Sequence, residues 1–345
     1  MRTLKISLLV FILSNTLSAQ EGWFWQNPLP QGNDLRKVCF ADSIKGFAVG
    51  EFGTMLITED AGDTWIIQQI GINSNLNDVS FYNMDIGMAV GEYGTVIKTT
   101  NGGKFWFNLS STTTQHLRGI DFIDENIVMV VGNAGTILST TNGGITWFSQ
   151  ASGTTYDLYD VCFTDINVGH VVGAGGRYLR TTNEGVTWSR ILVGTTSILT
   201  SIHFVGTNLG IITGGTGTIL RTVNGGLTWT WQGVPAINAL YEVFLINVDL
   251  GIIAGWDNYS QDGIVLKTTN GGISWFFVST GTESTVFQSV FLTDSNSVCV
   301  VGKNGLIIRS EDGGNGWIQE TTGIRKDLNN ISFSDEQHGT AVGNN

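Results

Sequence analysis

Proline, cysteine and charged residues are all scarce in this chain of 345 residues. It has 3 Pro, 3 Cys and 13% charged residues, whereas roughly a quarter of the residues in an average domain are charged. With 41% apolar residues, so low a charge content excludes a disordered chain. Three cysteines are too few for the dense, even-numbered disulfide framework of a small secreted domain.

Glycine and aromatic residues are abundant instead. The chain has 46 Gly, 11 Trp and 18 Phe. The glycines do not recur at every third position, which excludes collagen. A helical bundle would be rich in Ala, Glu, Lys and Leu, so we expect an all-β protein whose strands are separated by glycine-rich turns.

The N-terminus has the pattern of a secretory signal peptide. Arg2 and Lys5 precede an apolar run from Ile6 to Leu13, and small residues follow up to Ala19. The run is too short to span a bilayer as a helix. We therefore expect a signal peptide at residues 1–19, export to the periplasm, cell surface or medium, and no membrane span. The alternative is a buried N-terminal strand.

The net charge of −12 disfavours nucleic acid as a partner, because phosphate backbones repel an acidic protein. Cys39 and Cys162 occupy the same position in two non-adjacent repeats, so we expect no disulfide between them. All three cysteines, Cys299 included, are interpreted as small buried residues.

Tryptophan recurs with a period near 41 residues, which indicates an array of identical units. Residue 25 is also Trp, 40 positions before the first member of the series. The second copy shows four short strands: Leu76–Phe81, Gly87–Gly91, Gly94–Thr99 and one that begins at the tryptophan. Four strands in such a period are typical of a β-propeller blade. The recurring tryptophans are Trp65, Trp106, Trp147, Trp188, Trp229, Trp275 and Trp317.

A turn precedes each tryptophan. It consists of Thr or Ser, then Asn or Asp two positions later, then Gly after two more. Asn and Asp bond their own backbone in turns, and Gly adopts positive φ without a steric penalty. Such a turn fixes the register of the hairpin. The amide or carboxylate residues are Asp60, Asn101, Asn142, Asn183, Asn224, Asn270 and Asp312.

This unit resembles the Asp-box, or BNR, repeat of sialidase-like propellers, most fully in the segment from Thr58 to Trp65. The wider unit, with Val-x-Phe, Ala-Val-Gly, Gly-Thr-Ile and Asn-Gly-Gly-x-Thr-Trp, is similar to the photosystem II stability and assembly factor propellers. The resemblance covers residues 21 to 345. It implies a propeller that binds a partner polypeptide through an arginine-rich surface.

We name the strands of each blade A to D along the chain. Seven complete sets are expected at 35–320, and one propeller domain at 20–345. A further D strand at 21–28 would join A and B strands at 328–345 in a closing partial blade. This favours eight blades; the alternatives are a seven-bladed ring with loose terminal strands, or a chain that ends within its eighth unit.

Strand alternation places the B–C and D–A loops on one face, and the A–B loops and Asp-box turns on the other. One B–C loop carries an insertion of five residues between Gly255 and Gly263. Aromatic and acidic residues in a loop suit the binding of a partner. The alternative is a tolerated insertion with its tryptophan folded back on the blade, and calcium coordination by its Asp and Asn residues is a weaker possibility. The predicted binding residues are Trp256, Asp257, Asn258, Tyr259 and Asp262.

Cations also recur in the C strands, three residues before the turn Asn or Asp. They could form a positive patch, but we favour a structural role in which their stems cover aromatic residues and their charges pair across strands. They are Lys98, Arg180, Arg221, Lys267 and Arg309.

Catalysis is not expected, and no cofactor or metal is predicted. The Phe-Arg-Ile-Pro signature of sialidases is absent from the sequence. His116, His170, His203 and His338 lack metal-ligand spacing. We expect an exported, monomeric scaffold that binds a protein and serves complex assembly. The alternatives are a glycan-binding or sialidase-like propeller, and an assembly factor of the photosystem II type.

Overall fold

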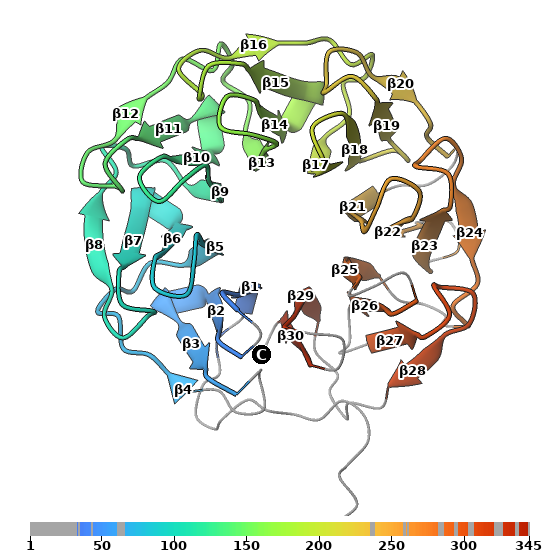
Figure 1. The fold of residues 1–345 in the computed structure, drawn as a ribbon, viewed down its shortest axis with the longest axis horizontal. Coiled ribbons are helices and arrows are strands. Elements are labelled where there is room, and N and C mark those ends of the chain that lie inside the picture. The colour runs from blue at the N-terminus through green and yellow to red at the C-terminus, as the bar shows by residue number, and fades with distance from the viewer. Residues whose placement is uncertain are drawn as a thin grey trace, which may run out of the picture.

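The computed structural model describes residues 33, 35–42, 44–60, 66–234, 239–257, 260, 262–281, 286–292, 296–302, 307–320, 327–334 and 338–343. These residues form a ring of antiparallel β-sheets around a central axis (Figure 1). The predicted all-β propeller with four-stranded blades is confirmed. Within the described part of the chain, no helix has the length and hydropathy of a membrane span.

Each of seven blades has the strand order A-B-C-D, and the A strands lie nearest the axis (Figure 1). The A strands are β1 (Leu35–Phe40), β5 (Leu76–Phe81), β9 (Leu117–Phe122), β13 (Leu158–Phe163), β17 (Leu199–Val205), β21 (Ala239–Leu245) and β25 (Phe287–Leu292). The B strands are β2 (Gly46–Gly50), β6 (Gly87–Gly91), β10 (Val128–Gly132), β14 (Gly169–Gly173), β18 (Leu209–Gly214), β22 (Gly251–Trp256) and β26 (Val298–Gly302).

The outer half of each blade consists of strands C and D. The C strands are β3 (Met55–Thr58), β7 (Thr95–Thr99), β11 (Ile137–Thr140), β15 (Arg177–Thr181), β19 (Ile219–Thr222), β23 (Gly263–Thr268) and β27 (Ile307–Ser310). The D strands are short: β4 (Ile66–Ile67), β8 (Phe107–Ser110), β12 (Phe148–Ser149), β16 (Ser189–Arg190), β20 (Thr230–Trp231), β24 (Phe276–Val278) and β28 (Ile318–Glu320). Short outer strands leave little free sheet edge for other chains to pair with.

The favoured count of eight blades is wrong, because the described residues form seven four-stranded blades. After the seventh, the described residues add only a two-stranded sheet of β29 (Leu328–Phe333) and β30 (Gly339–Gly343). This sheet lies between the seventh and first blades, where β29 contacts both β25 and β1. It has strands A and B but no described C or D strand. The D strand predicted at 21–28 lies outside the described residues.

The apolar core lies between neighbouring blades. The B strands are buried along their length, as in β6 and β10, because each is covered by a blade on both sides. Met88 and Val90 of one blade pack against Leu117 and Ile120 of the next, and the pattern recurs around the ring. Stacked in this way, each blade buries an apolar face that it could not bury alone.

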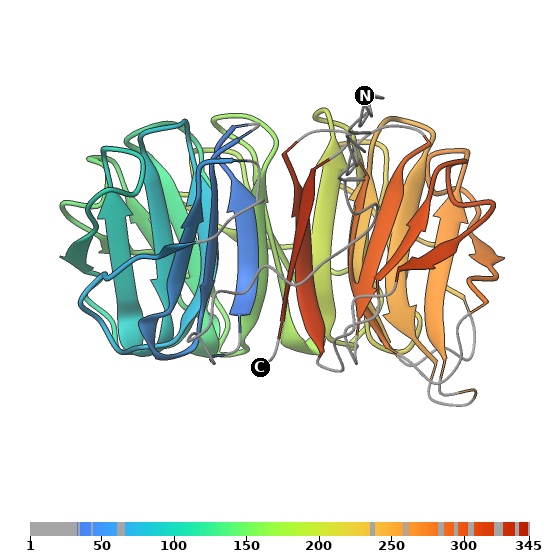
Figure 2. The ribbon, with the colours of Figure 1, turned by 90° about the horizontal axis from the view of Figure 1, so that it is seen from below.

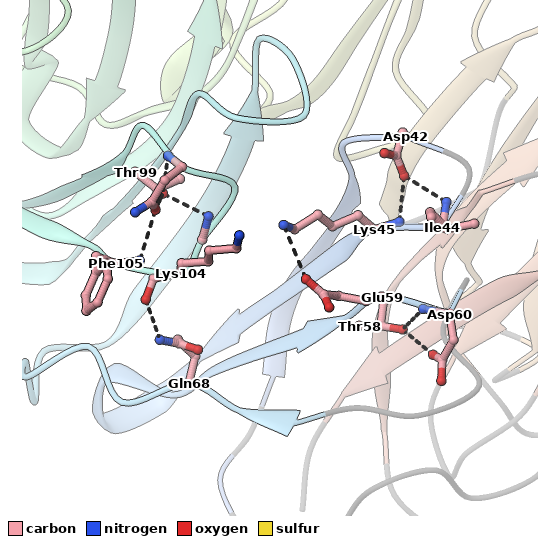
Figure 3. Close-up of polar contacts among 12 residues, drawn as sticks. Asp42, Ile44, Lys45, Thr58, Glu59, Asp60, Gln68, Thr99, Lys104 and Phe105 are labelled. Atoms are coloured by element: carbon pink, nitrogen blue, oxygen red, sulfur yellow. Dashed lines mark hydrogen bonds and ion pairs between the residues drawn. The ribbon is translucent and has the colours of Figure 1, made fainter.

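Side-chain hydrogen bonds hold the Asp-box turns. In the third blade the Thr140 hydroxyl donates to Asn142 Oδ1 at 3.0 Å and accepts from the Gly144 amide at 2.9 Å. Asn142 Oδ1 also accepts from the Thr146 amide at 2.9 Å. In the first blade the Thr58 hydroxyl donates to Asp60 Oδ1 (Figure 3). In the second blade the Phe105 amide donates to Asn101 Oδ1. The Thr and Asn side chains of the third-blade turn thus accept hydrogen bonds from several of its backbone amides.

The repeated tryptophan packs where two blades meet. The ring of Trp106 lies edge-on to Phe47 of the preceding blade and to Phe81 of its own blade, at 6.0 Å between centroids in both pairs. Trp147, Trp188 and Trp275 are buried, while Trp106, Trp229 and Trp317 are half-buried. These six tryptophans are thus at least half-buried, and their anchoring role stays a prediction; Trp65 lies outside the described residues.

Candidate functional site

The two faces of the ring carry different loops, as predicted. The Gly143 amide in an Asp-box turn donates to the Asn126 carbonyl in an A–B loop at 2.9 Å. On the other face, the Asn133 amide in a B–C turn donates to the His116 carbonyl in a D–A loop at 2.8 Å. Figure 2 shows the ring from the side, with the strands running between these two faces and the B–C face below. We refer to the two faces as the Asp-box face and the B–C face.

Tight turns of one shape cover the first five blades on the B–C face. Four are single 3₁₀ turns: η1 (Glu51–Gly53), η2 (Glu92–Gly94), η3 (Asn133–Gly135) and η4 (Ala174–Gly176). The middle residue of each turn has a left-handed backbone, and so does the equivalent Thr216 of the fifth blade, at φ 56°. The glycine that follows is required: a Cβ on Gly53 would collide with the Ile72 carbonyl oxygen. The turns are therefore closely packed and fixed in position.

Arg36 joins the turns of the first two blades. Its guanidinium lies 3.2 Å from Glu51 Oε1 and 3.3 Å from Glu92 Oε1. Burial of Glu92 opposes ionisation, but hydrogen bonds from Asn75 and Arg36 and the charge of Arg36 outweigh it and lower the pKa of that carboxyl. The Glu92 carboxylate therefore remains charged at the junction of these blades.

An exposed tyrosine, Tyr156, and a half-buried one, Tyr159, each lie against an arginine of the third or fourth blade. The Arg177 guanidinium lies 4.1 Å from the centre of the Tyr156 ring, and that of Arg118 lies 5.4 Å from the centre of the Tyr159 ring. Both distances suit cation–π attraction. This part of the B–C face therefore presents aromatic rings together with cations.

The inserted B–C loop of the sixth blade extends its hairpin instead of forming a tight turn. Trp256 is half-buried, ends β22 and pairs with Gly263. The Asp257 amide donates to the Asp262 carbonyl at 3.0 Å, which continues the ladder. Asn258 and Tyr259 lie outside the described residues. The binding role of this hairpin therefore stays a prediction.

Side chains of the inner strands link adjacent blades around the central axis. Asp78 accepts from the Ile120 amide of the next blade at 3.0 Å, and Asp160 accepts from the Ile202 amide at 3.0 Å. Two positions further along the strand, Asp121 accepts from the Phe163 amide at 2.7 Å. These bonds satisfy amides on the free inner edge of each blade. Because the acceptors are carboxylates, the inner wall of the ring is acidic.

The electrostatics of this inner wall follow from burial. Burial raises the pKa of Asp121 to about 7 and that of Asp160 to about 6, and it also raises that of Asp78. Burial alone would lower the pKa of Lys37, but the charges of Glu242, Asp78 and Asp160 outweigh it and raise that pKa.

His203 also belongs to the inner wall, and burial lowers its pKa to about 4. The ring is therefore neutral near pH 7, and its Nδ1 accepts from the Leu245 amide at 3.3 Å. Its role is structural, like that of the carboxylates.

The cations of the C strands also have a structural role, which we favoured over a positive binding patch. They reach the Asp-box turn of the next blade, where Lys98 donates to the Gly143 carbonyl at 2.7 Å and Arg180 to the Gly225 carbonyl at 2.7 Å. Arg221 bonds Gly271 in the same way, and Lys267 bonds Asn315. Arg309 differs and pairs with Glu311 at 3.0 Å. Most partners are thus turn carbonyls rather than the carboxylates that we expected.

The cysteines form no disulfide, but one expectation about them is wrong. Only Cys299 is fully buried; Cys39 and Cys162 are half-buried. The latter two stand on the inner strands β1 and β13, and their thiols face the amides of Phe81 and Phe204 in the next blades. Burial raises the pKa of Cys39 to about 12 and raises that of Cys162, so both thiols are neutral.

No group of three or more His, Cys, Asp or Glu suited to a metal ion occurs among the residues that the structure describes. His170 is buried, and its Nδ1 lies 2.8 Å from the Tyr178 hydroxyl. Burial lowers the pKa of His170 to about 3, so this ring is neutral within the core.

Comparison with known proteins identifies the family. The model of the photosynthesis system II assembly factor YCF48 family matches residues 17–154, 105–196 and 184–284. The chain belongs to this family. The three matches together extend over most of the seven blades, as a repeat shared by successive blades would produce. No curated protein matches the chain.

Solved structures show the same fold at low identity. A structure of YCF48 bound to a D1 peptide has a TM-score of 0.64 and 17% identity, and the match covers 80% of this chain and 91% of that one. YCF48 from Cyanidioschyzon merolae has a TM-score of 0.62 and 21% identity, covering 92% and 95%. The GH74 xyloglucanase from Xanthomonas campestris has a TM-score of 0.63 and 11% identity, covering 85% of this chain and 55% of the enzyme.

The sequence reasoning missed the B–C turns of the first two blades. A signal was available, because the residue before the turn glycine is Phe52 or Tyr93 there and Ala134, Gly175 or Thr216 in the next three blades. The residues of the inner wall were missed as well. Asp78 and Asp160 each lie between two buried apolar residues of their A strand, as a solvent-facing residue can.

Proposed function

We propose that this chain is a non-catalytic scaffold that binds a polypeptide through its B–C face and thereby serves the assembly of a protein complex. The observation that carries the proposal is the membership of the assembly-factor family, because a matched YCF48 structure holds a D1 peptide. The carboxylates of the inner wall support the non-catalytic part of the proposal, because they already accept hydrogen bonds from backbone amides of the next blade.

The B–C face supports binding by its shape and composition. Its turns are held by backbone hydrogen bonds to the D–A loops, so a partner need not order them on binding. Exposed aromatic rings and charged groups lie together there, and such residues contribute strongly to interfaces. The hairpin with Trp256, Asp257, Asn258, Tyr259 and Asp262 belongs to the same face, and we propose it as a second contact region.

The proposal includes export and a monomeric state. The charged and apolar pattern of residues 1–19 supports a signal peptide. N-terminal sequencing of the protein from its source would show a mature chain that begins near residue 20, and light scattering would give the mass of one chain. A full-length N-terminus or a stable dimer would contradict these two statements.

Selection of peptides tests the binding function. The chain without residues 1–19 is immobilised and panned against a library of random 12-residue peptides, with a synthetic D1 peptide as a separate arm. Binding of selected peptides, weakened by Trp256→Ala with Tyr259→Ala, is expected; retained affinity would contradict the hairpin contact. D1 binding would support a photosystem-type partner. Turnover of a sialoside or of xyloglucan would contradict the non-catalytic assignment.

A further inference from the structure

Two aromatic side chains occupy strained positions on the B–C face. Phe52 and Tyr93 are the middle residues of η1 and η2, with φ of 53° and 56°. A left-handed backbone is unfavourable for residues with a Cβ and is normally left to Gly or Asn. The equivalent residues of the next three blades are small: Ala134, Gly175 and Thr216.

Burial does not explain these two aromatic residues. Phe52 is 65% exposed and Tyr93 is 68% exposed, so neither ring contributes much to the core. Within the described part of the chain, Tyr93 has one ring neighbour, His116 of the next D–A loop, at 4.9 Å between centroids. Such a contact adds little to the packing of two rings that remain largely exposed, and strain with so small a gain in packing points to a function. Phe52 lies in the first blade and Tyr93 in the second, and both are on the face that we propose for binding.

The two turns are joined into one rigid unit. Arg36 contacts Glu51 and Glu92, the residues directly before the two aromatics. The Phe52 amide donates to Asn75 Oδ1 at 2.8 Å, which ties η1 to the D–A loop. We call Arg36, Glu51, Phe52, Glu92 and Tyr93 the blade 1–2 clasp.

The third and fourth blades show that aromatic rings on this face pack against cations. Tyr156 and Tyr159 each carry an arginine of this chain over the ring, at 4.1 and 5.4 Å. In the part of the chain that the structure describes, no Lys or Arg lies over Phe52 or Tyr93. Arg36 is held by the two carboxylates instead. The clasp therefore offers two rings and two carboxylates, with one cation to balance them.

We propose that the blade 1–2 clasp binds a Lys or Arg side chain of a polypeptide partner, which rests on the polypeptide-binding function proposed above. The cation lies against the rings of Phe52 and Tyr93, and its charge is attracted by Glu51 and Glu92. The net charge of −12 favours the approach of a basic segment over long range. The rigid turns hold both rings in place before the partner arrives.

The test uses the peptides selected from the random 12-residue library on the chain without residues 1–19. Dissociation constants are measured by fluorescence anisotropy for the strongest binders and for copies in which each Lys or Arg is replaced by Gln. The protein variants are Phe52→Gly with Tyr93→Gly, and Ala134→Gly as the matched control. Glycine suits all three left-handed positions, so each variant keeps its turn.

Selected peptides are expected to be enriched in Lys or Arg, and one such residue is expected to account for at least a tenfold change in affinity. Phe52→Gly with Tyr93→Gly should weaken binding at least tenfold, while Ala134→Gly should change it less than twofold. Neutral or acidic binders, or unchanged affinity in the double variant, would overturn the cation site but leave polypeptide binding intact. If no peptide binds at all, the proposed function fails and this inference fails with it.

Discussion

Replacement of Asp121 by Asn tests the description of the inner wall. The Asp121 side chain accepts a hydrogen bond from the Phe163 amide of the next blade at 2.7 Å. An Asn amide oxygen can accept the same bond, so the variant keeps the link between blades and removes only the charge. Burial, and to a lesser degree the nearby carboxylates of Asp160 and Asp78, raise the pKa of Asp121 from 3.8 to about 7.

The sign of the effect follows from this raised pKa. The folded protein binds the proton of Asp121 more tightly than the unfolded chain does. The stabilisation by that proton is complete below about pH 4 and is lost as the pH rises to 7. A shift of about three pKa units corresponds to about 4 kcal/mol. Because the side chain is only half-buried, solvent screening reduces the expected effect to about 2 kcal/mol.

Thermal unfolding at pH 5 and pH 8 measures this difference. For a chain of this length, about 2 kcal/mol corresponds to a Tm change of about 3 °C. Asp121→Asn should raise the Tm by that amount at pH 8 and by clearly less at pH 5. The exposed Asp249→Asn is the control and should change neither value. A Tm gain of Asp121→Asn that is equal at both pH values, or a loss at pH 8, would refute the reasoning.

Three further predictions concern stability. Trp147→Ala should destabilise the fold by about 3–5 kcal/mol in chemical denaturation, because it leaves a cavity between blades. The control, Trp231→Ala at an exposed position, should cost less than about 1 kcal/mol. Equal losses in the two variants would contradict the packing described. Thr140→Val removes a hydroxyl that bonds two groups of an Asp-box turn and should cost about 1–3 kcal/mol, measured in the same way; no loss would speak against the turn bonds. Phe52→Gly with Tyr93→Gly should leave the Tm unchanged or raise it. The relief of backbone strain, about 1–2 kcal/mol at each position, balances or exceeds the entropy cost of glycine in the unfolded chain. A clear fall in Tm would show that the two rings stabilise the fold.

The blades were predictable because their signals are local and repeated. The spacing of Trp106 from Trp147, and the turn residues before each, lie within one hairpin and recur around the ring. The A and B strands predicted for the second copy of the repeat agree with β5 and β6. The C strand of the same copy begins one residue later than predicted, because Gly94, which we placed first in it, belongs to the preceding 3₁₀ turn.

The blade count and the inner wall could not be predicted in the same way. Sheet membership at the end of the ring depends on contacts between β29 and strands far away in the sequence, β1 and β25. Asp78 and Asp160 bond amides more than 40 residues further along the chain, and no local pattern records such a pairing. Alternation distinguishes the two faces of a strand, but it does not tell a channel wall from an outer surface.

The candidate site was only partly predictable. The insertion around Trp256 is visible because it breaks the period, whereas the clasp of Phe52 and Tyr93 keeps the period and differs only in side-chain size. Arg36 gives no sequence signal for its two carboxylate partners, which lie 15 and 56 residues away. The juxtaposition of the first two blades is what brings these groups together.

Footprinting of the complex with a selected peptide tests the central claim, that one face of a rigid ring binds a polypeptide. Hydroxyl radicals label exposed side chains in the free and bound protein, and mass spectrometry locates the change. The account predicts protection of Phe52, Tyr93 and the hairpin after Trp256, with Ile145 and Ile273 on the Asp-box face unchanged. Protection of the Asp-box face, with the B–C face labelled as in the free protein, would contradict it.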